Sequence, residues 1–312
     1  MQTLAVVLEQ PKCLTLRAVD LMPPGPRDVV VEIDWSGVST GTERLLWSGR
    51  MPPFPGMGYP LVPGYEATGR VVEAGSASGR TPGERVFVPG SSGFRDARGL
   101  FGASARRVVV AGDRVVPVPP TREHAESCLF ALAATALHAV HRTGLPELIV
   151  GHGVLGRLTA RLCLALGGSP PTVWEVNPSR CTGADGYGVM HPDEDARRDY
   201  VRALDVSGDA GILNQIVPRL QRQGSVVLAG FYADAVRFDF PPAFQREVEI
   251  FVAAEWQRED LAAVSRMVED GRLALSGLIT HTAAAREAPT AYPRAFEDPT
   301  CLKMVLDWRD TR

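Results

Sequence analysis

The sequence lacks paired cysteines, an excess of basic residues and a long apolar run. Its cysteines are odd in number, far apart and without a C-x-x-C pair: Cys13, Cys128, Cys163, Cys181 and Cys301. This pattern argues against a disulfide framework and a cysteine-rich zinc site, and favours a reducing cytoplasm. The formal net charge of −3 and the pI near 6.1 argue against nucleic acid as a partner.

Signals for membrane insertion or export are also missing. The first residues, MQTLAVVLEQPK, do not combine a basic start with an apolar core, so no signal peptide is indicated. The richest apolar run, SCLFALAATALHAV, is shorter than the roughly 18 residues that suggest a membrane span. We expect it to form a buried helix, and we expect no transmembrane segment.

Two regions of different texture follow each other along the 312 residues. Up to about Pro120, short β-rich runs such as DVVVEIDWSG and EATGRVVEAG are separated by Gly and Pro, which predicts a small barrel or sandwich. Beyond it, apolar strands such as ELIV, TVWEV, SVVLAG and VEIFV alternate with expected helices at 154–168 and 209–224. This alternation predicts an α/β domain with a parallel sheet.

A glycine pattern opens the second region. ELIVGHGVLG places Gly151, Gly153 and Gly156 between an apolar strand and an amphipathic helix. In that context Gly151 permits a tight turn, Gly153 lets the backbone approach a pyrophosphate, and Gly156 allows close packing of helix and strand. The sequence therefore predicts a dinucleotide site. His152 inside the loop either touches this cofactor or is exposed.

An acidic residue follows the next strand. Glu175 lies 24 residues after Gly151, near the spacing at which a carboxylate binds the adenosine ribose. A carboxylate there would repel the extra phosphate of NADP, so we expect NAD as the cofactor. Arg180 could partly offset that repulsion, which leaves NADP as the alternative.

The stretch LVPGYEATGRVVEAG places Tyr65 and Glu66 where a chain leaves a Gly turn and enters a strand. A tyrosine at such a point is usually packing. The β-rich first region, the dinucleotide unit and the strand-like ending EDPTCLKMVLDW together resemble the medium-chain dehydrogenase/reductase superfamily. The resemblance implies a GroES-like catalytic domain over 1–119 and 277–312, and a Rossmann NAD-binding domain over 120–276.

The resemblance also gives the Tyr65–Glu66 pair a meaning. Zinc-dependent members carry Gly-His-Glu where this chain has Gly-Tyr-Glu, and a Cys where the segment Thr40–Glu43 begins; the remaining ligand position falls near Ala131. A site without that thiolate and imidazole is not a usual zinc site. The sequence therefore resembles a zinc-free branch, and we expect no metal.

Residues 35–66 are similar to a branch that oxidises the ring-A hydroxyethyl group of a (bacterio)chlorophyllide to acetyl with NAD. The resemblance implies a chlorophyllide-type tetrapyrrole as substrate. The segment RMPPFPGMGYP agrees with it, because Met and aromatic side chains suit a large flat apolar ligand. The predicted substrate residues are Trp47, Met51, Phe54, Met57 and Tyr59; the alternative is an ordinary Pro-rich surface loop.

Alcohol oxidation without a metal requires a side chain or water relay to take the hydroxyl proton. The predicted catalytic residues are Thr42, Glu43, Tyr65 and Glu66, with His138 and His152 as more remote candidates. Two other functions stay open: a zinc-free NADPH-dependent quinone or enoyl reductase, and a non-catalytic NAD-binding pigment carrier. A homo-oligomer is expected by analogy with the superfamily.

Overall fold

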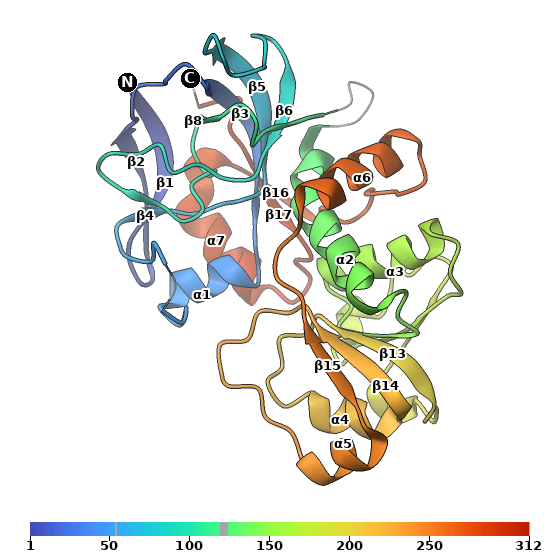
Figure 1. The fold of residues 1–312 in the computed structure, drawn as a ribbon. Coiled ribbons are helices and arrows are strands. Elements are labelled where there is room, and N and C mark those ends of the chain that lie inside the picture. Colours follow the sequence, from blue (N-terminus) through green and yellow to red (C-terminus); the bar gives the residue numbers. More distant parts are fainter. Residues whose placement is uncertain (54, 119–123, 312) are drawn as a thin grey trace. The chain divides into compact units, whose positions relative to one another are not determined.

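The computed structural model describes residues 1–53, 55–118 and 124–311. These form two compact units, Met1–Ala131 with Leu278–Arg312, and Leu132–Gly277 (Figure 1). The second unit is thus an insertion that begins in the helix α2 (Phe130–Thr143), which contains much of the apolar run at 127–140. Among the described residues, no helix is long and apolar enough to cross a membrane.

The first unit is built from two sheets. Strands β2 (Cys13–Asp20), β1 (Gln2–Gln10), β4 (Leu61–Val62) and β7 (Arg98–Gly99) form the smaller sheet in that order. The larger sheet has the order β16 (His281–Ala284), β17 (Met304–Asp307), β3 (Asp28–Val38), β5 (Ala67–Ala74), β6 (Arg85–Val88) and β9 (Val116–Pro117), with β8 (Arg107–Ala111) also paired to β3. The C-terminal strand β17 therefore pairs directly with β3.

Short helices complete this unit. Helix α1 (Thr42–Ser48) follows β3, and α7 (Ala288–Glu297) lies between β16 and β17 in the chain. Buried residues of α7, including Tyr292, pack into the same apolar core as valines of β3 and β5. The chain end is thereby built into the core of the first 120 residues, which is how residues about 240 positions apart reach one site.

The second unit has a six-stranded parallel sheet. Its order is β12 (Gly188–Met190), β11 (Thr172–Trp174), β10 (Leu148–Val150), β13 (Tyr200–Asp205), β14 (Leu220–Leu228) and β15 (Glu249–Val252). The order reverses at β10, and the crevice at such a reversal is where doubly wound sheets bind nucleotides.

Alternating side chains of these strands bury opposite faces of the sheet. Val227 and Leu204 pack with α2, and Ile149 packs with α3 (Val154–Ala165), whereas Leu148 and Val226 pack with α4 (Leu213–Ile216). The remaining α-helices of the unit are α5 (Phe240–Arg246) and α6 (Arg258–Glu269).

The helix predicted over 209–224 is mostly wrong. Only residues 213–219 are helical, and Leu220–Gly224 already belong to β14. Pro218 explains the early end, because proline lacks the N–H needed to continue a helix and restricts the residue before it. Strand β14 is therefore longer than the sequence pattern indicated.

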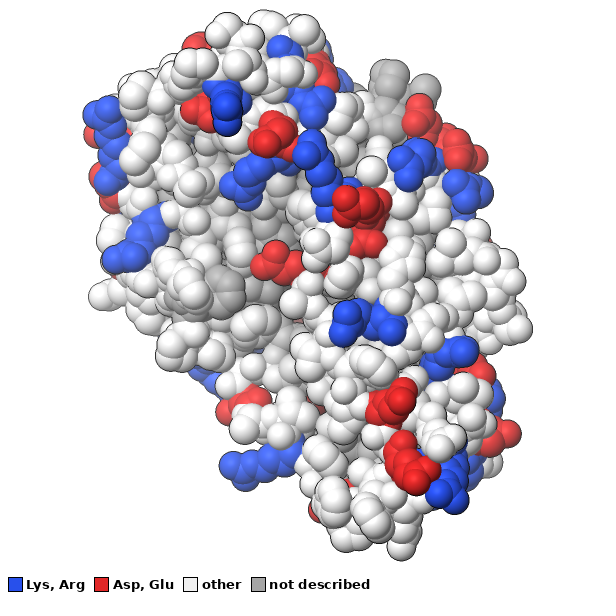
Figure 2. All heavy atoms as spheres, viewed as in Figure 1, with Lys and Arg blue, Asp and Glu red and all other residues white. Residues whose placement is uncertain are grey.

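Charged side chains are mixed on the face shown in Figure 2, where Lys and Arg alternate with Asp and Glu. Among the charged residues of the first unit, some form local ion pairs, such as Arg80 with Glu84 at 3.1 Å and Arg17 with Glu9 at 2.7 Å. This face offers no continuous basic surface to a polyanion.

Candidate active site

Tyr65 and Glu66 enter β5 through a turn that requires glycine. Gly64 has a φ of +101°, and a Cβ there would lie 2.5 Å from Ser104 Oγ and 2.8 Å from the Ser104 backbone nitrogen. Any other residue would strain the backbone and collide with Ser104. The glycine thus allows the phenol and the carboxylate to follow directly at the strand entrance.

The Tyr65 hydroxyl is held by small polar groups. It donates a hydrogen bond to Ser39 Oγ at 2.8 Å, and its ring meets Phe101 edge-on with centroids 5.3 Å apart. Burial, and then the Glu66 charge, raise the pKa of Tyr65 far above its usual range, while Ser39 and Thr42 oppose the shift. Tyr65 is therefore a neutral phenol at physiological pH. Ser39 was not predicted from the sequence.

Glu66 is fully buried and forms an ion pair with Lys303, which is also buried. Burial raises the pKa of Glu66, and the Lys303 ammonium opposes that shift. The pair needs Gly37 on β3, because a Cβ there would lie 2.3 Å from Glu66 Oε2 and 3.0 Å from Lys303 Cε. An unpaired buried charge is costly, so Lys303 is what permits an ionised Glu66 at this position.

Glu43, in the first turn of α1, is the second buried carboxyl. Burial, followed by repulsion from Glu66, raises the pKa of Glu43 to about 8; Tyr292 and Lys303 act in the opposite direction. Among the described residues none makes a hydrogen bond of normal geometry to its carboxylate oxygens. Tyr292 lies beside it and is 3.3 Å from Ser104 through the hydroxyl oxygens.

The four predicted catalytic residues therefore lie in one cluster of the first unit, together with Ser39, Tyr292 and Lys303. We call these seven residues the polar cluster. Tyr292 and Lys303 come from the C-terminal segment, and no local pattern connects them with Tyr65. Within the described ranges, no group of three or more His, Cys, Asp or Glu side chains could hold a metal ion. That this site works without zinc stays a prediction.

The predicted substrate residues form an apolar group. Trp47, Met51, Met57 and Tyr59 are partly buried and pack around Leu46 and Leu61. The Tyr59 hydroxyl donates to the Leu46 carbonyl at 2.5 Å, and the Trp47 ring lies 5.6 Å from that of Phe296. The segment is thus more than a loose surface loop. Phe54 lies outside the described residues.

In the second unit the glycine loop has the geometry that the pattern predicts. Gly151 has a φ of +100°, and a Cβ on Gly156 would lie 1.8 Å from the Gly151 carbonyl oxygen. Gly153 caps α3, and nothing lies within 4 Å of the position its Cβ would take. The amino end of a twelve-residue helix is therefore open beside a backbone that can approach a phosphate.

Glu175 is buried directly after β11. Its Oε2 accepts the His152 backbone N–H at 2.9 Å, and its Oε1 accepts the Asn177 backbone N–H at 2.8 Å. Each oxygen keeps a lone pair for a further donor. The carboxylate is thus fixed in orientation beside the glycine loop, as a ribose-binding group requires.

His152 is buried rather than exposed, contrary to one of the two expectations for it. Its Nδ1 lies 2.6 Å from the Arg180 carbonyl and its Nε2 lies 2.8 Å from the Tyr187 hydroxyl. Because a carbonyl can only accept, Nδ1 carries the proton and Nε2 accepts from Tyr187. Both ring nitrogens are therefore engaged within the unit. His138 is bonded through Nδ1 to Asp260 at 2.9 Å.

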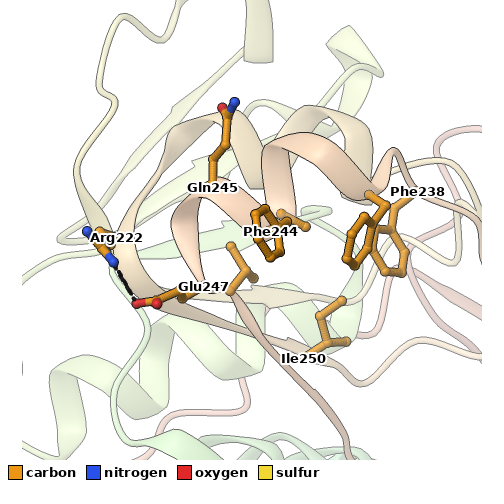
Figure 3. A pocket seen from close by; sticks show the side chains of 9 residues that line it. Arg222, Phe238, Phe244, Gln245, Glu247 and Ile250 are labelled. Carbon is orange, nitrogen blue, oxygen red and sulfur yellow. Dashed lines mark hydrogen bonds and ion pairs between the residues drawn. The ribbon is translucent and has the colours of Figure 1, made fainter.

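A groove of about 400 Å³ lies elsewhere in the second unit, against α5 and the edge strand β15 (Figure 3). Its aromatic lining includes Phe238 and Phe244, which are 40% and 68% exposed. Arg222 and Glu247 form an ion pair of 3.2 Å at one end of it. None of the predicted site residues lines this groove.

Comparison with known proteins agrees with this architecture. Residues 25–120 match the model of the alcohol dehydrogenase GroES-like domain. An acetophenone reductase from Geotrichum candidum solved with NAD superposes with a TM-score of 0.83 at 20% identity, over 100% of this chain and 98% of that one. A dehydrogenase from Sinorhizobium meliloti 1021 bound to NADP gives 0.81 at 20% identity, over 99% of this chain and 100% of that one. These matches confirm the predicted GroES-like and Rossmann fold.

Two relatives are similar over their whole length. Both are named 2-desacetyl-2-hydroxyethyl bacteriochlorophyllide A dehydrogenase, from Rhodobacter capsulatus (53% identical over 315 residues) and from Cereibacter sphaeroides (54% over 318 residues). Each alignment covers 100% of this chain and of the relative. The resemblance carried by residues 35–66 is confirmed, and the chain belongs to the bacteriochlorophyllide dehydrogenase family of the medium-chain dehydrogenases.

Proposed function

We propose that this chain oxidises the 1-hydroxyethyl group on ring A of a (bacterio)chlorophyllide a to an acetyl group, with NAD as the oxidant. The observation that carries the proposal is the full-length identity of 53% and 54% to two dehydrogenases named for such a substrate. In the reaction the carbinol carbon gives up a hydride and the hydroxyl gives up a proton.

The second unit fits a nicotinamide dinucleotide. Gly151, Gly153 and the open amino end of α3 would hold the pyrophosphate, and Glu175 would accept hydrogen bonds from the adenosine ribose. The bound nicotinamide supplies the hydride acceptor. A fixed, buried Glu175 supports NAD over NADP, because a carboxylate beside the ribose disfavours a 2′-phosphate.

The polar cluster supplies the proton route. Tyr65 orients the substrate hydroxyl, and its own hydroxyl passes the proton toward Ser39 or Thr42. Tyr65 is not the final acceptor, because its pKa lies far above neutrality. Glu43 has a pKa of about 8, which suits a group that exchanges protons near neutral pH. The Glu66 carboxylate and the Lys303 ammonium neutralise each other next to Glu43.

The apolar group at 47–59 would contact the macrocycle. Trp47, Met51, Met57 and Tyr59 give a partly buried wall of large, polarisable side chains, which matches a flat apolar pigment. Phe54 is included in this proposal from the sequence alone.

We also propose that copies of the chain associate through the face that carries the groove of Figure 3. Strand β15 is the edge of the parallel sheet, and its last residue, Val252, is 67% exposed. Phe240 and Phe244 of α5 are 66% and 68% exposed. An exposed edge strand beside large apolar side chains favours pairing with another chain.

The test is NAD reduction, followed at 340 nm, on adding a hydroxyethyl chlorin to the purified protein in the presence of a chelator. We expect turnover without added zinc, and Tyr65→Phe to lower kcat by roughly 10²–10⁴, the usual effect of lost proton-transfer assistance. Tyr200→Phe is the matched control, because it removes a buried phenol hydroxyl bonded to Asp195 at 2.8 Å in the other unit.

Each alternative has its own result in this assay. NADPH-dependent reduction of a quinone or enone, without oxidation of the chlorin, would show the reductase instead. Nucleotide and pigment binding without turnover would show a carrier. Activity that disappears in chelator and returns with zinc would refute the metal-free site, and near-parental turnover of Tyr65→Phe would leave packing as the role of that tyrosine.

A further inference from the structure

Arg157 is a buried cation surrounded by backbone carbonyls. It lies in the first turn of α3, directly after Gly156, and is 7% exposed. Its Nε donates to the His152 carbonyl at 3.2 Å. Its Nη1 donates to the Gly183 carbonyl at 3.3 Å, and its Nη2 to those of Arg180 and Thr182 at 3.0 and 2.7 Å. All three guanidinium nitrogens therefore bind the backbone.

The contacted carbonyls belong to two separate pieces of chain. One is the glycine turn, through His152. The other is the segment 177–183, which follows Glu175 and starts with the short 3₁₀ turn Pro178–Arg180. The planar guanidinium of an arginine has five N–H donors and can bridge two such pieces of chain. The ammonium of a lysine has only three donors on one nitrogen and cannot bind the same four carbonyls. Gly183 makes room for the fork, because a Cβ there would lie 2.4 Å from Arg157 Nη1.

A second hydrogen bond, made by His152, joins the same two pieces of chain. The Arg180 carbonyl accepts from His152 Nδ1 at 2.6 Å as well as from Arg157. Tyr187 fixes the other side of the imidazole through its hydroxyl. Burial lowers the pKa of His152, which favours the neutral ring that this arrangement needs.

These hydrogen bonds of Arg157 and His152 determine the orientation of the Glu175 carboxylate. Its two anchoring donors are the backbone N–H groups of His152 and Asn177. His152 is held from its carbonyl by Arg157, and Asn177 begins the segment that Arg157 holds at its other end. Arg157 therefore positions both donors to Glu175 without bonding to Glu175 itself.

We propose that Arg157 is a positioning residue for the cofactor, which joins the glycine turn to the segment 177–183 and so presents Glu175 to the adenosine ribose. The proposal rests on the proposed function in that it takes a nicotinamide nucleotide as the ligand. It assigns the effect of Arg157 to the adenosine half, so ADP-ribose should depend on Arg157 as much as NAD does.

The experiment measures dissociation constants for NAD and ADP-ribose by calorimetry, without pigment, on the parent, Arg157→Met, Arg157→Lys and Arg161→Met. Arg161 is the matched control, one turn further along α3, because its Nη1 binds the carbonyls of Ala274 and Ser276 at 2.8 and 3.0 Å, and neither residue is among those that anchor Glu175. For Arg157→Met we expect both ligands to weaken about tenfold or more, since bonds to charged groups are lost. Arg157→Lys should recover only part of this, and Arg161→Met should bind as the parent does.

Steady-state kinetics and hydrogen exchange separate positioning from folding. Arg157→Met should raise the KM for NAD with kcat within about twofold of the parent, the pattern of lost ground-state binding. Amides of 177–183 should exchange faster in Arg157→Met while the parallel strands stay protected.

Parental affinity in Arg157→Met would overturn the proposal, as would full recovery in Arg157→Lys or equal losses of kcat, pigment binding and strand protection. If Arg157→Met does not fold, Arg157→Lys decides: weaker binding of both ligands with parental strand protection supports the proposal, and parental binding overturns it. A parent that binds neither NAD nor ADP-ribose would instead refute the proposed cofactor.

Discussion

Glu43→Gln tests the central feature of the polar cluster, a buried carboxyl that is protonated near neutral pH. The amide has nearly the shape of the neutral acid and cannot ionise. In the parent, the pKa of Glu43 moves from 4.5 to about 8 because the carboxyl is buried and lies near Glu66. Between these two values the folded protein holds a proton that the unfolded chain has released.

The sign and size of the effect follow from proton linkage. The folded state binds more protons in this window, so the free energy of unfolding of the parent falls as pH rises, by at most about 1.4 kcal/mol per pH unit. The contribution is complete below pH 4.5, is lost through the window and stays constant above about pH 8. Relative to the parent, Glu43→Gln should therefore gain stability with rising pH, about 3 kcal/mol between pH 4.5 and 7 as an upper bound.

The assay is urea unfolding of parent and variant at several pH values from 5 to 9. The urea concentrations at the unfolding midpoint are compared where the two proteins have the same m value. Glu66, Lys303, Tyr65 and Tyr292 face Glu43 in both proteins, so the difference between them isolates the Glu43 proton. Glu73→Gln, at an exposed position of β5, is the control and should show no such trend. A parent-to-variant difference that is flat from pH 5 to 8 would refute a protonated Glu43.

Two further predictions concern the second unit. Glu175→Ala should weaken NAD about tenfold or more, because charge-assisted hydrogen bonds to the ribose are lost; fluorescence titration checks this, and equal use of NADP and NAD by the parent would contradict the assignment. Phe244→Ser should shift the protein toward monomer in sedimentation velocity, since this side chain is 68% exposed on the face with the edge strand; a parent that already sediments as a monomer would contradict association there.

The features that could be predicted from the sequence are those encoded within short stretches. The glycine turn is one, because three glycines between a strand and a helix leave few other conformations. Tyr65 and Glu66 are another, because they follow a glycine turn at a strand entrance. In both cases the backbone constraint and the residues that it positions are within a few residues of each other.

The features that could not be predicted depend on contacts across the chain. Lys303 reaches Glu66 only because β17 pairs with β3, and Tyr292 reaches Glu43 only because α7 packs into the same core. In the sequence, Arg157 is one polar residue within an amphipathic helix. Its proposed role depends on backbone carbonyls 23 to 26 residues later. Because every residue has a backbone carbonyl, the sequence does not show which of them an arginine will bind.

The charges of the polar cluster explain why one of its two carboxyl groups stays protonated. Lys303 is the only ammonium among its seven members, and Glu43 and Glu66 would together carry two negative charges if both were ionised. A net charge without solvent is costly, so protonating Glu43 leaves Glu66 to Lys303 and makes the cluster neutral. The same cost keeps Tyr65 a phenol. Oxidation of an alcohol releases one proton, and a phenol whose pKa lies far above neutrality cannot keep it. We therefore infer that the proton travels past Tyr65 and leaves the cluster. Glu43 already carries a proton near neutral pH, so it takes part only as a relay, releasing one proton as it receives another.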